Sequence, residues 1–496
     1  MWKYYLFVAV FSITSQIVLS QVNYQQSPID IKDLMNTVKF LSSERFKGRL
    51  PGTVEYEQAS RYVATRFKNA GLKPLLGNTM LQDFDEEVNY ILDARVFLLD
   101  QNNRLTQPMY LGEDFVCRGF TGSGEVQGET VFVGFGIETD EYNDYRSVDV
   151  RNKIVIAFKS DPPWKAGSGS WGDTSPRAKA RIAKEHGAKA IIFIGEPQMK
   201  PNTMVYGSIA CGPKPHLADF PMIHAGSRFT NSLFSKLPYK PADYYEKIKH
   251  DKAPHSIETD ISVYINVRAV YQEAKKTFNV VGYVEGSDPK LKHEYIILGA
   301  HLDHVGYQGD RLYFPGANDN ASGVAGLIAI ANAINKSNPK PLRSIVFVAF
   351  SSEESGLKGS RHFVANMPFP SEKVVAMLNF DCIGQGDSIA IGGRLSYSKL
   401  WKKAKKLDRK TTKLLSSKTF GGGGADAQAF HEAGIPTLYF NTSGGYKFLH
   451  QTTDKPETLN ATVFEKTVHL GYLTTMELAN KRYKREKDRQ KSRPRK

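Results

Sequence analysis

Residues 294–303 read EYIILGAHLD, an apolar run that ends at two polar side chains, His301 and Asp303. Later parts of the chain repeat this pattern of a short apolar run followed by polar residues: RSIVFVAF (343–350), KVVAMLNFD (373–381) and IPTLYFN (435–441). Such runs are typical of strands buried on both faces, as in parallel sheets. Helical patterns lie between and after them, in GVAGLIAIANAI (323–334) and around 464–480. We therefore predict an α/β fold with a central, mostly parallel mixed sheet sandwiched by helices.

Two further blocks precede this one. From Ile29 to about Asp100, apolar residues recur at three- and four-residue spacing, which predicts helices on either side of the turn FKGRLPGT (46–53). From about Tyr110 to Val267, short β-rich runs alternate with Gly/Pro/Asp-rich loops, so we expect a smaller β-rich α/β domain inserted there. The expected boundaries are a signal peptide at 1–20, an N-terminal part of the main domain at 21–109, the insert at 110–267, the main domain at 268–480 and a basic tail at 481–496.

Composition excludes several classes of protein. The 496 residues are 41% hydrophobic and 24% charged, which excludes a disordered or collagen-like chain. A mean hydropathy of −0.39 excludes a multispanning membrane protein. The net charge is +15, but the tail 481–496 alone holds ten Lys/Arg against two acids. Because a terminal basic run is usually a solvated tail, we expect no nucleic-acid partner, and at most a tether to an anionic surface.

The N-terminus and the cysteines bear on the compartment. The opening MWKYYLFVAVFSITSQIVLSQ has one Lys, an apolar stretch and small residues before Gln21, the form of a secretory signal peptide cleaved after Ser20. Its Ser/Thr/Gln content argues against a membrane anchor, and no later run reaches spanning length. We therefore expect an exported protein without an integral membrane span. Three cysteines cannot form a disulfide framework, and the pairing of Cys117 with Cys211 stays open.

Polar residues that could carry chemistry stand where the apolar runs end. Active sites of open α/β sheets collect at the carboxyl ends of strands. Five places qualify by this criterion: His301 with Asp303, Asp319 within GANDNASG (316–323), Glu353 with Glu354, Asp381, and His450 within FLHQTTD (448–454). Each is weak alone, since a lone His is usually structural and an adjacent Glu pair is usually solvated. Together they offer two histidines and enough carboxylates to hold two zinc ions, with one carboxylate left over as a base.

The motifs GAHLDHVG, PGANDNASG, FSSEESGLKGSRHF, NFDCIG and FLHQTTD resemble, in sequence order, those of the cocatalytic di-zinc aminopeptidase family. Its relatives include glutamate carboxypeptidase and the transferrin receptor. FKGRLPGT and its flanking helices resemble the N-terminal part of the family, and the insert resembles the protease-associated domain of some members. The resemblance implies a zinc metallopeptidase acting on peptides.

The resemblance also implies a role for each site residue. His301 and Asp381 would hold one zinc ion, Glu354 and His450 the other, and Asp319 would bridge both. Glu353 would be the general base, taking a proton from water and passing it to the leaving amine. Asp303 would orient the ligand His301, because a carboxylate fixes the tautomer of an imidazole. A cis peptide would follow Asp319. Cobalt or manganese could replace zinc in so carboxylate-rich a site.

Two departures from the family pattern concern the substrate pocket. Residues 424–428 read GADAQ, where many members have a Ser-Asp-His triplet. Leu449 precedes His450, where many members have a Tyr, and the nearby Tyr446 receives no role. We interpret His304, His362 and His431 as structural or pocket-lining residues.

Several functions remain open at this point. An exported aminopeptidase is the simplest expectation, and a carboxypeptidase or dipeptidase of the glutamate carboxypeptidase type is the main alternative. Arg394 could then bind a carboxylate, although a surface role suits it better. A noncatalytic receptor-like binding protein is the alternative from another class, and cyclase-like transfer chemistry is a further one. The sequence does not fix the preferred residue, the oligomeric state or the role of the tail.

Overall fold

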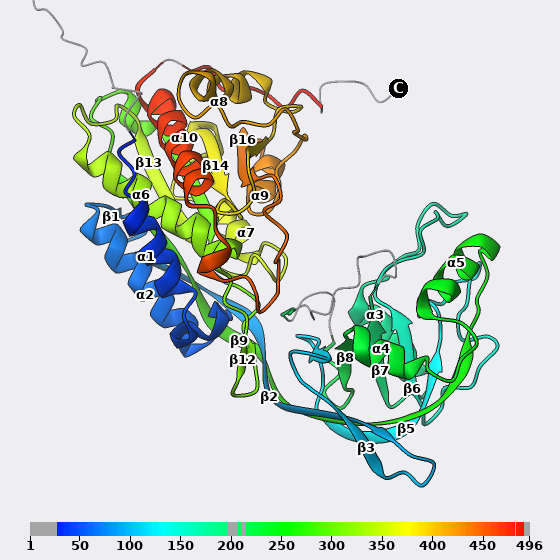
Figure 1. The fold of residues 1–496 in the computed structure, drawn as a ribbon. Helices are drawn as coiled ribbons and strands as arrows, with labels where there is room; N and C mark the ends of the chain where they lie inside the picture. Colours follow the sequence, from blue (N-terminus) through cyan, green and yellow to red (C-terminus); the bar gives the residue numbers. More distant parts are fainter. Residues whose placement is uncertain (1–26, 196–206, 210–214, 482, 491–496) are drawn as a thin grey trace, which may run out of the picture.

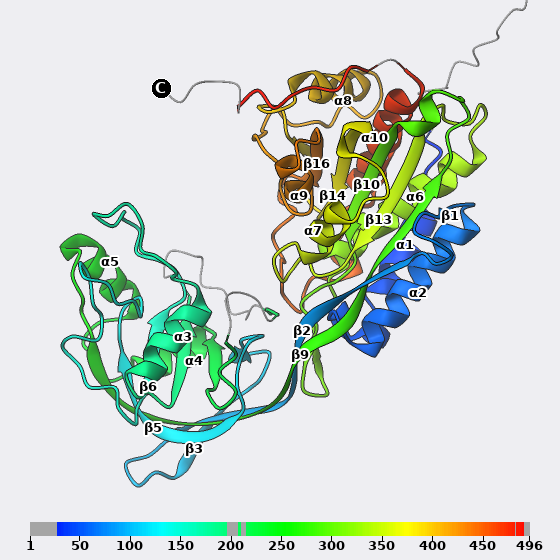
Figure 2. The same cartoon turned by 180° about the vertical axis from the view of Figure 1, so that it is seen from behind.

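The computed structural model describes residues 27–195, 207–209, 215–481 and 483–490. The expected signal peptide at 1–20 and Cys211 lie outside the described residues. The chain folds into two lobes joined by two long antiparallel strands, β2 (Leu81–Leu99) and β9 (Ile257–Val284) (Figures 1 and 2). Within the described residues, Cys117 and Cys382 are buried free thiols. None of the described helices is long and apolar enough to cross a membrane.

The larger lobe is built on the predicted parallel sheet. The strand order is β15-β16-β14-β10-β13-β9. The four parallel strands are the four apolar runs of the sequence: β10 (Tyr295–His301), β13 (Ser344–Phe350), β14 (Val374–Phe380) and β16 (Thr437–Thr442). Antiparallel strands flank them, with β15 (Ile389–Gly392) on β16 and the end of β9 on β13. The sheet is therefore mixed but mostly parallel, as predicted.

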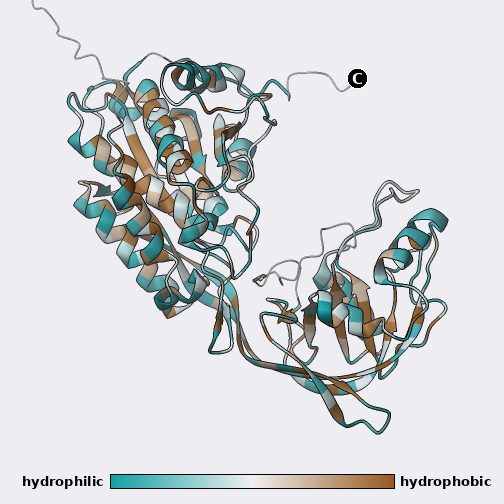
Figure 3. Ribbon diagram, in the orientation of Figure 1, coloured by the Kyte–Doolittle hydropathy of each residue, from teal (hydrophilic) through white to brown (hydrophobic). Residues whose placement is uncertain are grey.

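Helices cover both faces of this sheet. One face packs against the helices α1 (Ile31–Leu41), α2 (Val54–Asn69), α6 (Ser322–Lys336), α8 (Ser398–Lys410) and α10 (Ala461–Asn480). The other face packs against α7 (Lys358–Ala365) and α9 (Ala427–Glu432) through Phe363 and Phe430. The strands carry the apolar residues and the helices turn polar residues outward (Figure 3). This burial on both faces explains why the strand sequences are continuously apolar.

The smaller lobe is the predicted β-rich α/β insert. It comprises β3 (Leu105–Met109), β4 (Phe115–Cys117), β5 (Gly124–Phe132), β6 (Ile154–Phe158), β7 (Ala190–Ile194), β8 (Met222–Ala225), α3 (Pro176–Glu185), α4 (Ser227–Leu233) and α5 (Pro241–Asp251). Its hydrophobic core already includes Ile91, Ala94, Val96 and Met109. Part of β2 thus contributes to the core of the smaller lobe, because β2 runs from one lobe into the other, and the boundary at residue 110 stays a prediction.

The remaining elements are short. They are the strands β1 (Lys73–Pro74), β11 (Tyr307–Gln308) and β12 (Leu312–Tyr313), and single helical turns at Glu44–Arg49, Leu291–His293, Ala317–Ala321, Ser371–Lys373 and Pro456–Thr458. The described part of the basic tail exposes Lys481, Lys484, Lys487 and Arg489 to solvent but is anchored through one acidic residue. Glu486 is 7% exposed and its carboxylate accepts the backbone N–H groups of Lys399 and Leu400 at the start of α8. These contacts hold the tail against the larger lobe.

Candidate metal centre

Three neighbouring parallel strands deliver the predicted residues to one edge of the sheet. β10 lies between β13 and β14 and ends at His301. Glu353 and Glu354 follow β13 by three and four residues, and Asp381 directly follows β14. Because parallel strands end on the same side, the four side chains meet at the carboxyl edge of the sheet, as in other open α/β sheets.

His301, Asp319 and Asp381 form one buried group. The Nε2 atom of His301 lies 3.3 Å from Oδ1 of Asp319 and 3.4 Å from Oδ1 of Asp381. The three side chains are at most 8% exposed. Their donor atoms lie close enough together to bind one ion.

A second group shares Asp319 with the first. The Nε2 atom of His450 lies 2.8 Å from Oε2 of Glu354 and 3.3 Å from Oδ2 of Asp319. The Nδ1 atom of His304 lies 3.1 Å from Oε1 of Glu354 and 3.3 Å from Oδ2 of Asp319. Asp319 thus turns one oxygen to each group, which is the arrangement that a bridging carboxylate requires.

Asp303 sits behind the first group and is completely buried. Its Oδ1 atom lies 3.8 Å from Nδ1 of His301, the ring nitrogen that faces away from Asp319. The nearer partner of that nitrogen is the main-chain oxygen of Asp303, at 3.2 Å. Burial raises the pKa of the Asp303 carboxyl to about 7, although the charge of His301 opposes the rise.

The loop that carries Asp319 is fixed by two buried charged residues. The Asp319–Asn320 peptide bond is cis, as the family resemblance implies. Asp454 accepts the backbone N–H groups of Asn318 and Asp319 at 3.0 Å each. The guanidinium of Arg49 donates to four main-chain oxygens at 2.7–2.8 Å, those of Leu302, Leu41, Pro315 and Gly316.

Glu353 lies beside the two groups, with a carboxylate oxygen within 4.8 Å of ligand atoms of His301 and Glu354. Burial raises the pKa of its carboxyl well above the usual range; His301 opposes the rise, and Glu354 and Asp426 add to it. Asp426 is itself completely buried, and neither of its carboxylate oxygens has a hydrogen-bond partner among the described side chains and main chain. Burial raises the pKa of Asp426 to about 7. A positive charge at the centre would lower both pKa values.

An aromatic wall extends from Asp381 toward solvent. The hydroxyl of Tyr439 donates to Oδ2 of Asp381 at 2.7 Å and lies 2.6 Å from the hydroxyl of Tyr446. The ring of Phe420 lies 5.8 Å from that of Tyr439. Phe420 and Tyr446 are 40% and 46% exposed, so this wall can be reached from outside. Arg394 is exposed and its guanidinium lies 4.9 Å from the ring of Trp401, a surface position.

Sequence reasoning missed several residues of the site. It interpreted His304 as structural or pocket-lining, whereas the structure places its Nδ1 atom among the donors of the second group. It gave no role to Arg49, Asp426, Tyr439 or Asp454. The adjacent spacing in His301-Leu302-Asp303-His304 was an available signal for His304, but the others become visible only when distant segments meet.

The donor set fits zinc. Asp319 Oδ2, Asp381 Oδ1 and His304 Nε2 are buried, and within the described part of the chain none makes a well-formed hydrogen bond, although imidazole nitrogens lie 3.3–3.4 Å from the two carboxylate oxygens. Buried polar atoms without partners are costly, and a cation would satisfy the two carboxylate oxygens. Imidazole nitrogen and carboxylate oxygen are the ligands that catalytic zinc accepts.

The comparisons with known proteins agree with this geometry. Residues 279–472 match the model of peptidase family M28. The chain is 25% identical over 421 residues to a glutamate carboxypeptidase 2 homolog of Caenorhabditis briggsae, covering 70% of this chain and 53% of that one. It is 36% identical over 126 residues to an aminopeptidase of Pseudomonas aeruginosa (strain UCBPP-PA14), covering 25% and 21%. The chain thus spans about half, or less, of the length of these relatives.

Solved structures show the same fold. The aminopeptidase from Aneurinibacillus sp. strain AM-1 superimposes with a TM-score of 0.64 at 19% identity, covering 91% of this chain and 95% of that one. The zinc aminopeptidase BSAP from Bacillus subtilis gives 0.61 at 18% identity, covering 92% and 97%. Over about nine-tenths of its length the chain therefore has the fold of these two aminopeptidases, and residues 279–472 match peptidase family M28, which supports a di-zinc aminopeptidase-like family.

Proposed function

We propose that this protein is a zinc-dependent exopeptidase that removes N-terminal residues from peptides. One observation carries the proposal: a shared carboxylate, Asp319, stands between two His-and-carboxylate groups, with Glu353 beside them. Two ligand groups with a bridging carboxylate and one spare acid are what two-metal hydrolysis needs. His301 and Asp381 would hold one ion, and Glu354 and His450 the other.

When bound, the two zinc ions supply a water of lowered pKa and polarise the scissile carbonyl. The protein's own residues do the rest. Glu353 takes the proton of the attacking water and delivers it to the leaving amine, so its carboxylate must be ionised when the peptide binds. Asp319, with one oxygen toward each ligand group, keeps the two groups at a fixed distance from each other. Asp303 holds the main chain of Glu353 and Glu354, so that base and ligand keep a fixed relative position.

The charge of the site supports binding of a free amine. Around the ligand groups lie four further carboxylates, of Asp303, Glu353, Asp426 and Asp454. The positive charge of the Arg49 guanidinium lies near these carboxylates. This side chain is completely buried and donates to main-chain oxygens, so it is not available to bind a peptide carboxylate. A site rich in carboxylates attracts the ammonium end of a peptide more readily than its carboxylate end.

A carboxypeptidase of the glutamate carboxypeptidase type is the second candidate. The relative from Caenorhabditis briggsae favours it, since it matches 70% of this chain. This function requires a cationic side chain that reaches the terminal carboxylate of the peptide, and Arg394 does not supply one from its place over Trp401.

Hydrolysis of a panel of peptides tests the proposal. Aminoacyl chromogenic amides, their N-acetylated forms and peptides ending in glutamate would be offered to the wild type, to Glu353→Gln and to the exposed control Glu372→Gln. We expect cleavage of free-amine substrates alone, and a loss of about 100-fold or more in kcat for Glu353→Gln with both zinc ions retained. Cleavage only at the carboxyl end would support the second candidate. No turnover by a zinc-loaded wild type would point to a binding protein.

The insert and the N-terminus add two parts to the proposal. We propose that the insert is a protease-associated domain, on its β-rich α/β core and its place between two parts of the peptidase fold. We also propose export, on the pattern of residues 1–20. Expression with and without residues 1–20 tests the latter, because only the full chain should reach the medium or the cell surface.

A further inference from the structure

A short piece of the insert reaches the metal centre. The described residues Gly207, Ser208 and Ile209 lie against the larger lobe, and the backbone N–H of Gly207 donates to the main-chain oxygen of His450 at 2.8 Å. His450 is one of the proposed zinc ligands. The insert therefore touches the main chain of a residue whose ring takes part in the second ligand group.

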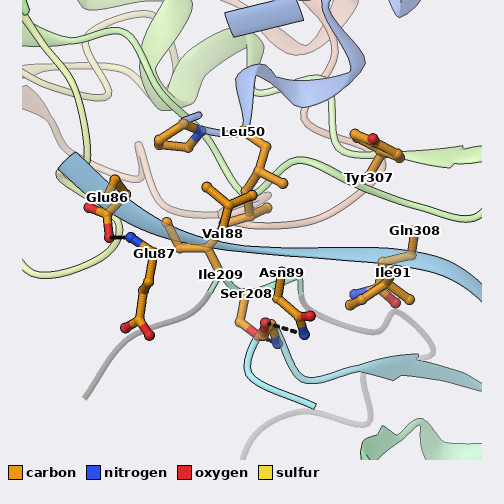
Figure 4. A pocket seen from close by; sticks show the side chains of 13 residues that line it. Leu50, Glu86, Glu87, Val88, Asn89, Ile91, Ser208, Ile209, Tyr307 and Gln308 are labelled. Carbon is orange, nitrogen blue, oxygen red and sulfur yellow. Dashed lines mark hydrogen bonds between the residues drawn. The ribbon is translucent and has the colours of Figure 1, made fainter. Parts of the chain in front are cut away.

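The contact is close and specific. A Cβ atom on Gly207 would lie 2.6 Å from Cγ2 of Val305 and 3.0 Å from the ring of Phe314, so no larger residue fits without movement. Ile209 packs in one apolar cluster with Leu50 and Val88. These side chains line a small pocket along β2, where both lobes meet (Figure 4).

Hydrogen bonds tie this segment to the body of the insert. The hydroxyl of Ser208 accepts the backbone N–H of Gly119 at 3.0 Å. The carbonyl of Gly119 in turn accepts from the side chain of Asn89 on β2, at 3.0 Å. The position of Gly207 is thus determined by the insert and by the strand that joins the lobes.

His450 needs support from outside its own loop. It has a φ of +55°, a left-handed conformation that non-glycine residues seldom adopt unless their surroundings hold them there. Its side chain is 28% exposed, whereas those of the other members of its group are at most 6% exposed. A partner for its carbonyl restricts the main chain and, through it, the direction of the ring.

Building on the proposed two-zinc site, we propose that the insert segment Gly207–Ile209 positions His450 as a metal ligand. The insert is then a structural part of the metal centre. Its displacement lowers the affinity for one zinc ion in particular, the one held by Glu354 and His450. The His301–Asp381 ion has no such dependence. Partners that orient a ligand typically change metal affinity by about 10- to 100-fold.

Zinc affinity measured without any peptide tests this inference. Competition with a chromophoric chelator gives the dissociation constants of both ions for Gly207→Val and for the matched control Gly195→Val, since a Cβ on Gly195 meets nothing within 4 Å. We expect one ion to bind about 10-fold more weakly or worse in Gly207→Val, with no change in the control. His450→Ala identifies that ion by its loss, and Gly207→Val should add little to His450→Ala.

A second variant guards against misfolding. Ser208→Ala adds no atoms and removes the acceptor for the N–H of Gly119. It should therefore also weaken the binding of the ion held by Glu354 and His450. Circular dichroism would establish that both variants are folded. If Ser208→Ala, and Gly207→Val where it folds, keep wild-type constants for both ions, the inference is wrong. A wild type that binds two zinc ions but cleaves nothing would contradict the proposed function and leave this inference standing.

Discussion

Asp303 accepts the backbone N–H of Glu353 through Oδ1 at 3.2 Å. Its second oxygen accepts the backbone N–H of Glu354, also at 3.2 Å. One buried carboxylate thus holds the main chain of the proposed base and of a proposed ligand, and the Oδ1 atom that accepts from Glu353 also lies 3.8 Å from Nδ1 of His301. The family resemblance implies that Asp303 orients His301; we propose in addition that its carboxylate fixes the main chain of Glu353 and Glu354.

We expect Asp303→Asn to lower kcat by about 10- to 100-fold, because a carboxamide can accept only one of the two N–H groups and turns a donor toward the other. The measurement is kcat and KM with a free-amine substrate, together with zinc content. Asp310→Asn, at an exposed position of the neighbouring loop, is the control. Wild-type kcat in Asp303→Asn would show that the loop after β13 keeps its geometry without this carboxylate.

The buried hydrogen bonds of Arg49 lead to a prediction about the stability of the fold. Arg49→Met leaves the buried main-chain oxygens of Leu302, Leu41 and Pro315 without this donor. Each orphaned buried acceptor costs about 1–3 kcal/mol, so we expect the free energy of unfolding to fall by about 3 kcal/mol or more. Arg61→Met, whose side chain is 65% exposed and pairs with Glu57 on the surface, should change it by less than about 1 kcal/mol. Denaturant unfolding of both variants tests this prediction. Equal unfolding midpoints for Arg49→Met and Arg61→Met would contradict it.

The sequence predicted the sheet and the residues at its edge well, for a physical reason. Strands buried on both faces must be continuously apolar, so β10, β13, β14 and β16 were visible as runs, and the chemistry begins where each run stops. The five proposed ligands and Glu353 consequently come together as expected.

The parts that could not be predicted depend on contacts between distant segments. Arg49 lies in a Gly/Pro turn, and its guanidinium finds acceptors more than 250 residues away. β2 is one strand with two environments, since Leu81 packs on the core of the larger lobe and Ile91 in that of the smaller one, and no change in composition marks the crossing. The basic side chains of the tail are exposed as expected, but its charge gave no sign that Glu486 would bind the start of α8.

A substitution of Tyr439 should affect the other zinc ion, not the one that Gly207 is proposed to support. Its hydroxyl donates to Asp381 at 2.7 Å, so Tyr439→Phe removes a partner of a proposed ligand without changing volume. We expect the His301–Asp381 ion to bind about 10-fold more weakly, while the His450 ion is unchanged. The control is Tyr397→Phe, another buried tyrosine with a bonded hydroxyl, whose partner is His431. Equal zinc constants in the two variants would rule out a role for Tyr439.

Glu86 and Glu87 on β2 hold the two lobes to each other. Ser355, next to the proposed ligand Glu354, donates to Glu86 at 2.9 Å, and Lys358 of α7 pairs with it as well. Arg177 of α3 binds both oxygens of Glu87 at 3.2 and 3.3 Å, with both side chains 3% exposed. A break in the register of β2 against β9 between Glu86 and Val88 lets consecutive carboxylates both be buried.

Because of the Glu87–Arg177 ion pair, we expect the insert to be held less tightly against the larger lobe at acidic pH. Burial acts to raise the pKa of Glu87, but hydrogen bonds from Arg177 and Tyr271 and the charges of Arg177 and Lys358 outweigh it, so the pKa lies below its ordinary 4.5. A lowered pKa in the folded state means that the pair stabilises the docked insert above about pH 4.5 and is lost as the pH falls through the lower value.

Acid also protonates the ligand carboxylates, so a variant at neutral pH has to separate the two effects. Glu87→Gln removes this charge alone, and we expect it at pH 7 to show faster tryptic cleavage near β2 and β9 and a larger radius of gyration by small-angle scattering. Asp83→Asn, in the same strand with a side chain 59% exposed, should behave as the wild type. If Glu87→Gln is as compact and as resistant as Asp83→Asn, packing rather than this ion pair holds the insert in place, and any opening at low pH must come from the metal centre.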